Sequence, residues 1–304
     1  MIHGVINVYK EAGFTSHDVV AKLRGICKQK KIGHTGTLDP DAVGVLPVCL
    51  GSATGLCDML TDKSKEYEAV FRLGFTTDTQ DISGKILERH EEMAAVITTE
   101  QVREAIASFE GTYEQIPPMY SALKVNGKKL YELAREGKEV ERKARLVEIS
   151  SIEIRQMNLP EISIRVACSK GTYIRTLCYD IGQQLGCGAT MVSLKRTRVG
   201  EFPINNALTL SQIEELAAKE ELSKVVIPVD AMFEQLKKIT VKEAFHKLLA
   251  NGNKIHIDQI EEKKDFKDQE QVCIYSYQHS FYGVFAYEEE TGFFKPVKMF
   301  LTDK

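Results

Sequence analysis

The densest group of chemically capable side chains lies in a glycine-rich stretch from Gly33 to Gly51, which begins GHTGTLDPDAVGVLPV. Its glycines permit tight turns and a close approach of a ligand to the backbone. Pro40 fixes the chain directly after Asp39 and biases that residue away from helix. Rigid loops of this kind on a sheet scaffold commonly carry catalytic groups. We therefore predict an active-site loop with Asp39 as its catalytic carboxylate.

Three simpler interpretations of this stretch compete. Asp39-Pro40 alone is typical of an ordinary turn. Residues 39–43 (DPDAV) match the DxDx[TV] nucleophile signature of one phosphatase class, but that motif ends a hydrophobic parallel strand, and no alternating β/α units follow here. Gly33–Gly36 matches the GxxG clamp of KH domains, which is a short pattern that occurs often by chance.

The bulk composition indicates an ordinary globular chain. It has 304 residues, 43% of them hydrophobic, which allows one large domain and a small one. No apolar run approaches the ~18–20 residues that span a bilayer, and the N-terminus is typical of a first strand rather than a signal peptide. We therefore expect a cytosolic, cytoplasmic protein without a membrane anchor.

Cysteine and histidine usage indicates neither disulfides nor metal. The seven Cys are odd in number and never have CxxC spacing, and the seven His form no HExxH or Cys/His cluster. We expect reduced, mostly buried thiols and no metal site.

Charge is distributed unevenly although the net charge is only -3. Residues 21–35 carry five basic residues and no acid, and residues 122–146 carry eight basic residues against four Glu. Residues 258–304 have ten acids against six Lys. Basic runs are most often solvated helix faces, but local basic stripes can also bind phosphates.

Hydrophobic periodicity predicts the elements that must position the loop. Strands are expected at 4–9, 45–50, 65–73, 85–90, 146–155, 162–168 and 191–198, helices at 15–30, 52–61, 99–109, 129–137, 172–185 and 211–219, and loops at 74–84 and 113–128. Two prolines and an Asn126-Gly127 turn predict that the second loop projects. Because no βαβ rhythm is present, we predict an α+β fold with a mixed, largely antiparallel sheet flanked by helices.

The sequence pattern changes near residues 229–240, beyond which short strands and a charged loop follow, and this change predicts a domain boundary. We assign residues 1–235 to the main domain and 238–304 to a small β-rich domain. In the latter we expect a helix at 241–250, a charged loop at 261–271 and strands at 273–277, 282–287 and 294–301.

The full string Gly-His-x-Gly-x-Leu-Asp-Pro-x-Ala-x-Gly-x-Leu-Pro resembles the catalytic motif of the TruB family of tRNA pseudouridine synthases. Further blocks resemble that family in the same order: Lys10–Ser16, with Glu11 where Pro is usual, Lys65–Tyr67, Gly74–Asp81, Gln115–Lys124, Ser169–Arg175 and Leu185–Gly188. The resemblance covers residues 4 to about 200. The last 65 residues resemble the family's PUA-like RNA-binding domain only in length and strand character.

The resemblance implies the pseudouridine synthase fold and isomerisation of the T-loop uridine of tRNA (U55) to pseudouridine. The N1–C1′ bond breaks, the uracil turns, and C5 bonds to C1′. No atom is gained or lost, so no cofactor is expected. The implied partner is the T-arm stem-loop of tRNA, and we expect a monomer.

The same resemblance assigns three catalytic residues: Asp39 as the essential carboxylate, Arg175 as its cationic partner, and Tyr67 as the ring that stacks on the target base and can assist proton transfer from C5. Whether Asp39 acts as nucleophile or as base is left open by the sequence. From sequence alone, Arg175 is equally consistent with a surface ion pair and Tyr67 with a cross-strand aromatic.

Four further residues match substrate-binding positions of the family. His34 matches the residue near the vacated T-loop position, Tyr173 a second active-site aromatic, Leu194 a pocket wall, and Lys10 a group that steadies the loop or a phosphate. The segment 113–146 matches an insertion that closes over the T-arm. The alternative from another class is a non-catalytic tRNA-binding or tRNA-folding module, which would not need Asp39, Tyr67 and Arg175 together.

Overall fold

The main body is built on one large sheet. The computed structural model describes residues 1–125, 127–262 and 265–301. The sheet has nine strands in the order β1-β3-β12-β4-β11-β10-β7, with β2 on β3 and β13 on β12. The strands are β1 (Gly4–Lys10), β2 (Ile32–His34), β3 (Val43–Leu50), β4 (Lys65–Leu73), β7 (Gly111–Gln115), β10 (Arg145–Asn158), β11 (Glu161–Cys168), β12 (Ala189–Val199) and β13 (Phe202–Pro203). Every pairing is antiparallel except β12 with β3. The predicted α+β class is confirmed.

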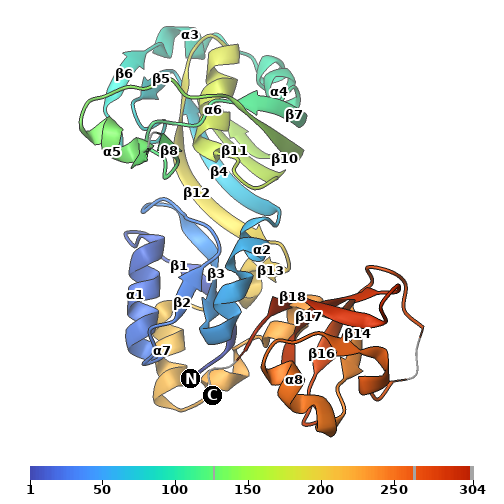
Figure 1. Cartoon of the computed structure of the whole chain (residues 1–304). Coiled ribbons are helices and arrows are strands. Elements are labelled where there is room, and N and C mark those ends of the chain that lie inside the picture. Colours follow the sequence, from blue (N-terminus) through green and yellow to red (C-terminus); the bar gives the residue numbers. More distant parts are fainter. Residues whose placement is uncertain (126, 263–264, 302–304) are drawn as a thin grey trace.

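Helices cover the two ends of this sheet separately, as Figure 1 shows. Helices α4 (Thr99–Ala107) and α6 (Ile174–Gln184) pack on the β4, β10 and β11 end. Helices α1 (Ser16–Ile26) and α7 (Leu210–Ala218) pack on β1 and β3. Short helical segments complete the main body: η1 (Gly51–Leu56), α2 (Cys57–Thr61), α3 (Glu91–Ala95), α5 (Leu130–Arg135), η2 (Ile204–Asn206), η3 (Leu222–Lys224) and η4 (Val229–Phe233).

Local sequence explains the elements nearest the site. β4 has the predicted bounds, and buried residues alternate along it with less buried ones. The residues of β11 alternate in the same way. α1 begins with a capping box in which the Thr15 side chain accepts from the Asp18 backbone N–H. It ends at Ile26 and not at about Lys30, because Lys28 takes a positive φ of 51°.

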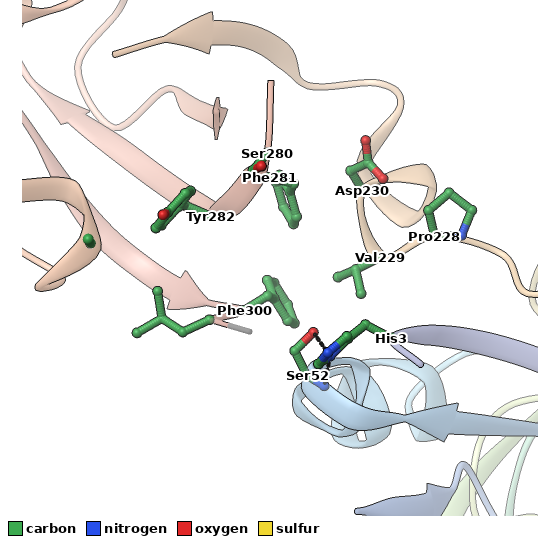
Figure 2. Close-up of a pocket in the computed structure, with 11 residues that line it drawn as sticks. His3, Ser52, Pro228, Val229, Asp230, Ser280, Phe281, Tyr282 and Phe300 are labelled. Atoms are coloured by element: carbon green, nitrogen blue, oxygen red, sulfur yellow. Dashed lines mark hydrogen bonds between the residues drawn. The ribbon is translucent and has the colours of Figure 1, made fainter. Parts of the chain in front are cut away.

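The C-terminal part forms a second, five-stranded sheet in the order β14-β16-β17-β18-β15. Its elements are β14 (Lys237–Thr240), η5 (Glu243–Phe245), α8 (His246–Ala250), β15 (Ile255–His256), η6 (Ile257–Gln259), β16 (Gln271–Tyr275), β17 (Phe281–Glu288) and β18 (Phe293–Met299). This sheet shares a hydrophobic cluster with the main body, in which Phe300 and Cys273 lie with Val5 and Leu56. A cavity of about 500 Å³ lies along the contact, with Phe281 and Phe300 on one side and His3 and Ser52 on the other (Figure 2).

Several expected elements differ from those found. Residues 241–250 do not form one helix: Val241 donates to the Tyr275 carbonyl and bridges to Ile260, so helix starts only beyond it, in η5 and α8. The expected loop 113–128 starts inside the sheet, because β7 pairs with β10. It then forms the hairpin β8 (Lys124–Val125) and β9 (Lys128–Lys129); Asn126 of the expected turn lies outside the described residues. The expected loop 74–84 opens with β5 (Phe75–Thr77), which pairs with β6 (Ile86–Arg89).

Among the helices of the described residues, none combines the length and the apolar character that crossing a bilayer requires.

Candidate active site

The loop between β2 and β3 carries Asp39 and is held from several sides. The Leu38 N–H donates to the Ser16 hydroxyl at 3.0 Å, and the Gly13 N–H donates to the Pro40 carbonyl at 3.0 Å. At its end, Gly44 has φ of +108°, and a Cβ there would lie 2.2 Å from the Arg196 carbonyl oxygen. Only glycine fits this close strand approach. The loop is therefore held in an ordered conformation by α1, by the connection between β1 and α1, and by β12.

Lys10 of β1 also supports this loop. Its side chain is fully buried, and its Nζ donates to the carbonyls of Glu11, Phe14 and Pro40 at 3.1, 2.6 and 2.9 Å. Burial lowers the pKa of Lys10 to about 8, while the charges of Asp41 and Asp39 oppose that shift. Of the two expected roles, this geometry favours support of the loop, because the ammonium group is already enclosed by carbonyls.

Asp39 and Arg175, 136 residues apart in sequence, meet in the structure. Arg175 Nη2 lies 3.4 Å from Asp39 Oδ1, and Arg175 Nη1 lies 3.6 Å from Asp81 Oδ2. Arg175 Nη2 also donates to the Tyr120 carbonyl at 2.6 Å. The Arg175 side chain is only 6% exposed, whereas that of Asp39 is 36% exposed. One buried guanidinium thus serves two carboxylates, and the first of these remains open to a ligand.

Burial and the neighbouring charges shift the pKa of Asp39 in opposite directions. Burial raises the pKa of the Asp39 carboxyl; the Arg175 charge lowers it, and the neighbouring Asp81 charge raises it again. The net direction is upward from the ordinary value of 3.8. Because a carboxylate must be ionised to act as a nucleophile or base, Arg175 is the main group that favours the reactive form, and the charge of Lys10 adds to its effect.

Arg175 is positioned by the start of α6. Tyr173 is the N-cap residue, and its backbone is held by Gln115: Tyr173 N–H donates to Gln115 Oε1 at 2.8 Å, and Gln115 Nε2 donates to the Tyr173 carbonyl at 3.0 Å. The Arg175 guanidinium carbon lies 5.9 Å from the centre of the Tyr173 ring. The structure therefore brings Tyr173 to the site, stacked beside the cation.

Tyr67 lies on β4 and is buried, with 8% of its surface exposed. Burial raises the pKa of its phenol, while the charge of Arg196, opposite Tyr67 on β12, lowers it. Asp39 is close enough to raise the pKa slightly. The three residues expected to be catalytic are thus brought into one neighbourhood.

The two remaining expected residues lie on strands of the large sheet. His34 is in β2, where its Nδ1 accepts the Gly36 N–H at 3.3 Å and its ring meets His17 edge to face at 5.3 Å. Burial lowers the pKa of His34, and the nearby His17 and Arg196 add to this. Leu194 faces Ala69 across β12 and β4 and is only partly buried against the core.

Sequence reasoning assigned no role to Asp81, Gln115, Tyr120 or Arg196. The first three stand in blocks that resemble the family, so the blocks contained the signal but not the roles. Arg196 is one of three basic residues in the strand Ala189–Val199, and nothing in that pattern distinguishes the buried one. Among the described residues, no group of three or more His, Cys, Asp or Glu side chains could hold a metal ion.

Two segments rich in basic residues lie outside the Asp39 loop. One follows the insertion through β8, β9 and α5, where Arg142 also binds the Pro117 carbonyl at 3.1 Å. The other is an open groove at the far end of α1. It is lined by Met1, Ile2, Arg24, Cys27, Lys28, Gln29, Lys30 and Lys31. An 11-residue helix is about 16 Å long, so this basic groove is well separated from Ser16 and the active-site loop.

The phosphatase interpretation does not agree with this architecture. Asp39 and Asp41 stand in a loop that follows β2, a strand of three residues that pairs antiparallel with β3. The signature would instead require the two acids to follow a buried parallel strand. The KH interpretation is also not supported, since Gly33 lies within a strand of the large sheet.

Comparison with known proteins agrees with the geometry. Residues 24–174 match the model of the TruB family pseudouridylate synthase N-terminal domain, and residues 175–234 match the tRNA pseudouridylate synthase B C-terminal domain. A tRNA pseudouridine synthase B from Lachnoclostridium phytofermentans is 52% identical, with 99% of this chain and 100% of that protein covered. One from Alkaliphilus oremlandii is 46% identical, with 90% of each covered.

Solved structures give the same result. The crystal structure of a Cbf5-Nop10-Gar1 complex matches 98% of this chain and 85% of the other, with a TM-score of 0.70 and 27% identity. An H/ACA RNP bound to a substrate RNA containing 2'-deoxyuridine matches equally well, with a TM-score of 0.70 and 25% identity. The chain therefore belongs to the TruB family of pseudouridylate synthases.

Proposed function

We propose that this TruB-family enzyme converts uridine 55 in the T-loop of tRNA to pseudouridine, with Asp39 as the catalytic carboxylate. The observation that carries the proposal is the partly open Asp39 carboxylate beside the buried Arg175 guanidinium, 3.4 Å away. Family membership and relatives that bear the name tRNA pseudouridine synthase B support the substrate.

The chemistry needs a base that has left the RNA stack, which costs a few kcal/mol. In the proposed mechanism Tyr67 stacks on that base, Leu194 and Tyr173 border it, and His34 occupies the position the base leaves. Asp39 attacks the nucleoside or removes a ribose proton, and either act requires the ionised form that Arg175 favours. Departure of C5–H and protonation of N1 balance, so no cofactor is consumed.

Phosphate contacts supply most of the affinity in such complexes. We assign them to the basic residues of the insertion 113–146 and to the basic groove at the end of α1. Specificity then comes from the shape of the T-loop and its splayed bases. The proposal assigns the C-terminal sheet, in residues 238–304, to a PUA-like RNA-binding unit. It also includes a monomeric state and a cytoplasmic location.

Release of tritium from tRNA labelled at uracil C5 tests the function. We expect release by the unsubstituted chain and none by Asp39→Asn. Because phosphates dominate affinity, tRNA affinity should stay within about tenfold in that variant. Tight binding without release by the unsubstituted chain would instead support the non-catalytic tRNA-binding module.

A further inference from the structure

Beside Lys10, the site holds a second fully enclosed cation, to which no role has been given. Arg196 on β12 is 1% exposed. Burying a charge is costly unless hydrogen bonds compensate for it. The two carboxylates of the facing strand β4 do not compensate for it: Glu68 pairs with Lys195 at 3.1 Å, and Glu66 pairs with Arg198 at 3.9 Å.

The Arg196 guanidinium binds parts of the active site. Its Nε donates to the Val45 carbonyl at 2.7 Å, and its Nη2 donates to the Gly36 carbonyl at 3.3 Å. These acceptors lie at the two ends of the loop that carries Asp39. Arg196 also stands opposite Tyr67 on the neighbouring strand, and its charge lowers the pKa of the Tyr67 phenol. A planar guanidinium has five donors in a fixed fork, so it can serve several acceptors in one rigid arrangement.

The sheet register explains why these contacts converge. β12 lies between β3 and β4. In it, Arg196 is opposite Gly44 of β3 and opposite Tyr67 of β4. The absence of a side chain at Gly44 allows the strands to approach closely. The Asp39 loop and the Tyr67 ring therefore share one neighbour.

We propose that Arg196 is a positioning residue of the isomerisation, which locks the two ends of the Asp39 loop together and holds that loop in a fixed arrangement with the neighbouring Tyr67. This inference rests on the proposed function. When the C5–H bond breaks, its electron pair stays in the ring and restores the C5–C6 double bond, while the proton passes to the Tyr67 phenolate oxygen and then to water. The Arg196 charge favours that phenolate. The other charged or titratable groups that act on Tyr67 are Cys168 at the end of β11 and Asp39 in the loop.

The test measures single-turnover tritium release and tRNA affinity for Arg196→Lys and Arg196→Gln. The matched control is Arg198→Lys, two positions along the same strand, with a 39% exposed side chain. We expect both Arg196 variants to lose about 100-fold or more in rate, as for removal of a preorganised donor, with affinity changed less than about threefold. The control should keep its rate.

The pH profile separates a role in the reaction from mere structural support. Without the Arg196 charge the pKa of Tyr67 rises, so the pH at which the rate levels off should move upward in Arg196→Gln and less in Arg196→Lys. A rate within about threefold of normal in Arg196→Lys would overturn the inference. So would equal losses of rate and affinity with an unmoved profile. Absence of release by the unsubstituted chain would overturn the proposed function itself.

Discussion

At the scale of the residue, the chemistry of the site depends on whether the Asp39 carboxyl is ionised. Asp39 is pushed toward its neutral form by burial and by Asp81, and toward its ionised form by Arg175. Its partner is 6% exposed and shared between two acids. Because the Asp81 carboxylate fixes the guanidinium from the other side, Arg175 can favour the ionised form of Asp39 while that carboxylate stays accessible to a ligand.

This balance predicts opposite shifts of the acid limb of the pH–rate profile. Arg175→Gln removes the charge that lowers the pKa of Asp39, so that pKa rises and the rate should fall off at a higher pH than normal. Asp81→Asn removes a charge that raises the pKa, so its acid limb should move to lower pH. Single-turnover tritium release between pH 5 and 8 measures both limbs. Shifts of the same sign in the two variants would contradict the electrostatic account.

At the scale of the element, the placement of α6 decides where Arg175 points. The Gln115 amide at the end of β7 makes two complementary hydrogen bonds to the Tyr173 backbone, and Gln115 is 1% exposed. A strand is thus connected to the helix N-terminus across 58 residues of sequence. Helix N-termini leave backbone N–H groups unsatisfied, and this side chain satisfies one of them.

We therefore predict that Gln115→Ala lowers both stability and rate. Leaving buried Tyr173 backbone groups unpaired costs about 1–3 kcal/mol, which a denaturant titration measures. The freed N-terminus of α6 should also lower single-turnover tritium release. Gln184→Ala is the control, since its hydrogen bonds to Ser108 at the other end of α6 are exposed. Equal effects of the two substitutions would count against a special role for the Gln115 contact.

The elements near the site were largely predictable from sequence, because hydrophobic periodicity is local. β4 was predicted residue by residue, and Asp39, Tyr67 and Arg175 followed from motif resemblance. Arg196 could not be predicted, because its burial depends on β12 lying between β3 and β4. The prediction of one helix over 241–250 was wrong because of tertiary structure too: Val241 forms a β-bridge with Ile260, and periodicity does not report such pairings.

At the scale of the whole molecule, the basic groove and the insertion predict how salt affects binding. Each lost phosphate contact should reduce the slope of log K against log salt by about 0.9 for duplex and about 0.7 for single strands. Substituting Lys28, Lys30 and Lys31 together by Gln should thus reduce the slope for full-length tRNA by about 2–3, without changing the chemical step at saturation. Filter binding across salt concentrations measures this. An unchanged slope would remove the groove from the RNA path.

The C-terminal sheet poses a different question, whether it is an independent attachment or part of one core. Phe300 is 2% exposed, and its ring centre lies 5.8 Å from that of Phe233 and 5.7 Å from that of Phe281. The cluster continues through Val229 to Val5 of β1. Such a shared core predicts that the two parts lose structure together.

Phe300→Ala should therefore destabilise the entire chain by about 3–5 kcal/mol, seen as one shifted denaturation transition by both far-ultraviolet circular dichroism and loss of tritium release. Leu301→Ala, at a side chain 42% exposed, should change little. A separate early transition that leaves tritium release intact would instead mean that the C-terminal sheet unfolds by itself. In the shared-core case, removal of residues 238–304 would expose Val229 and Phe233, so weaker tRNA binding by such a truncated chain would report lost stability as well as lost RNA contacts.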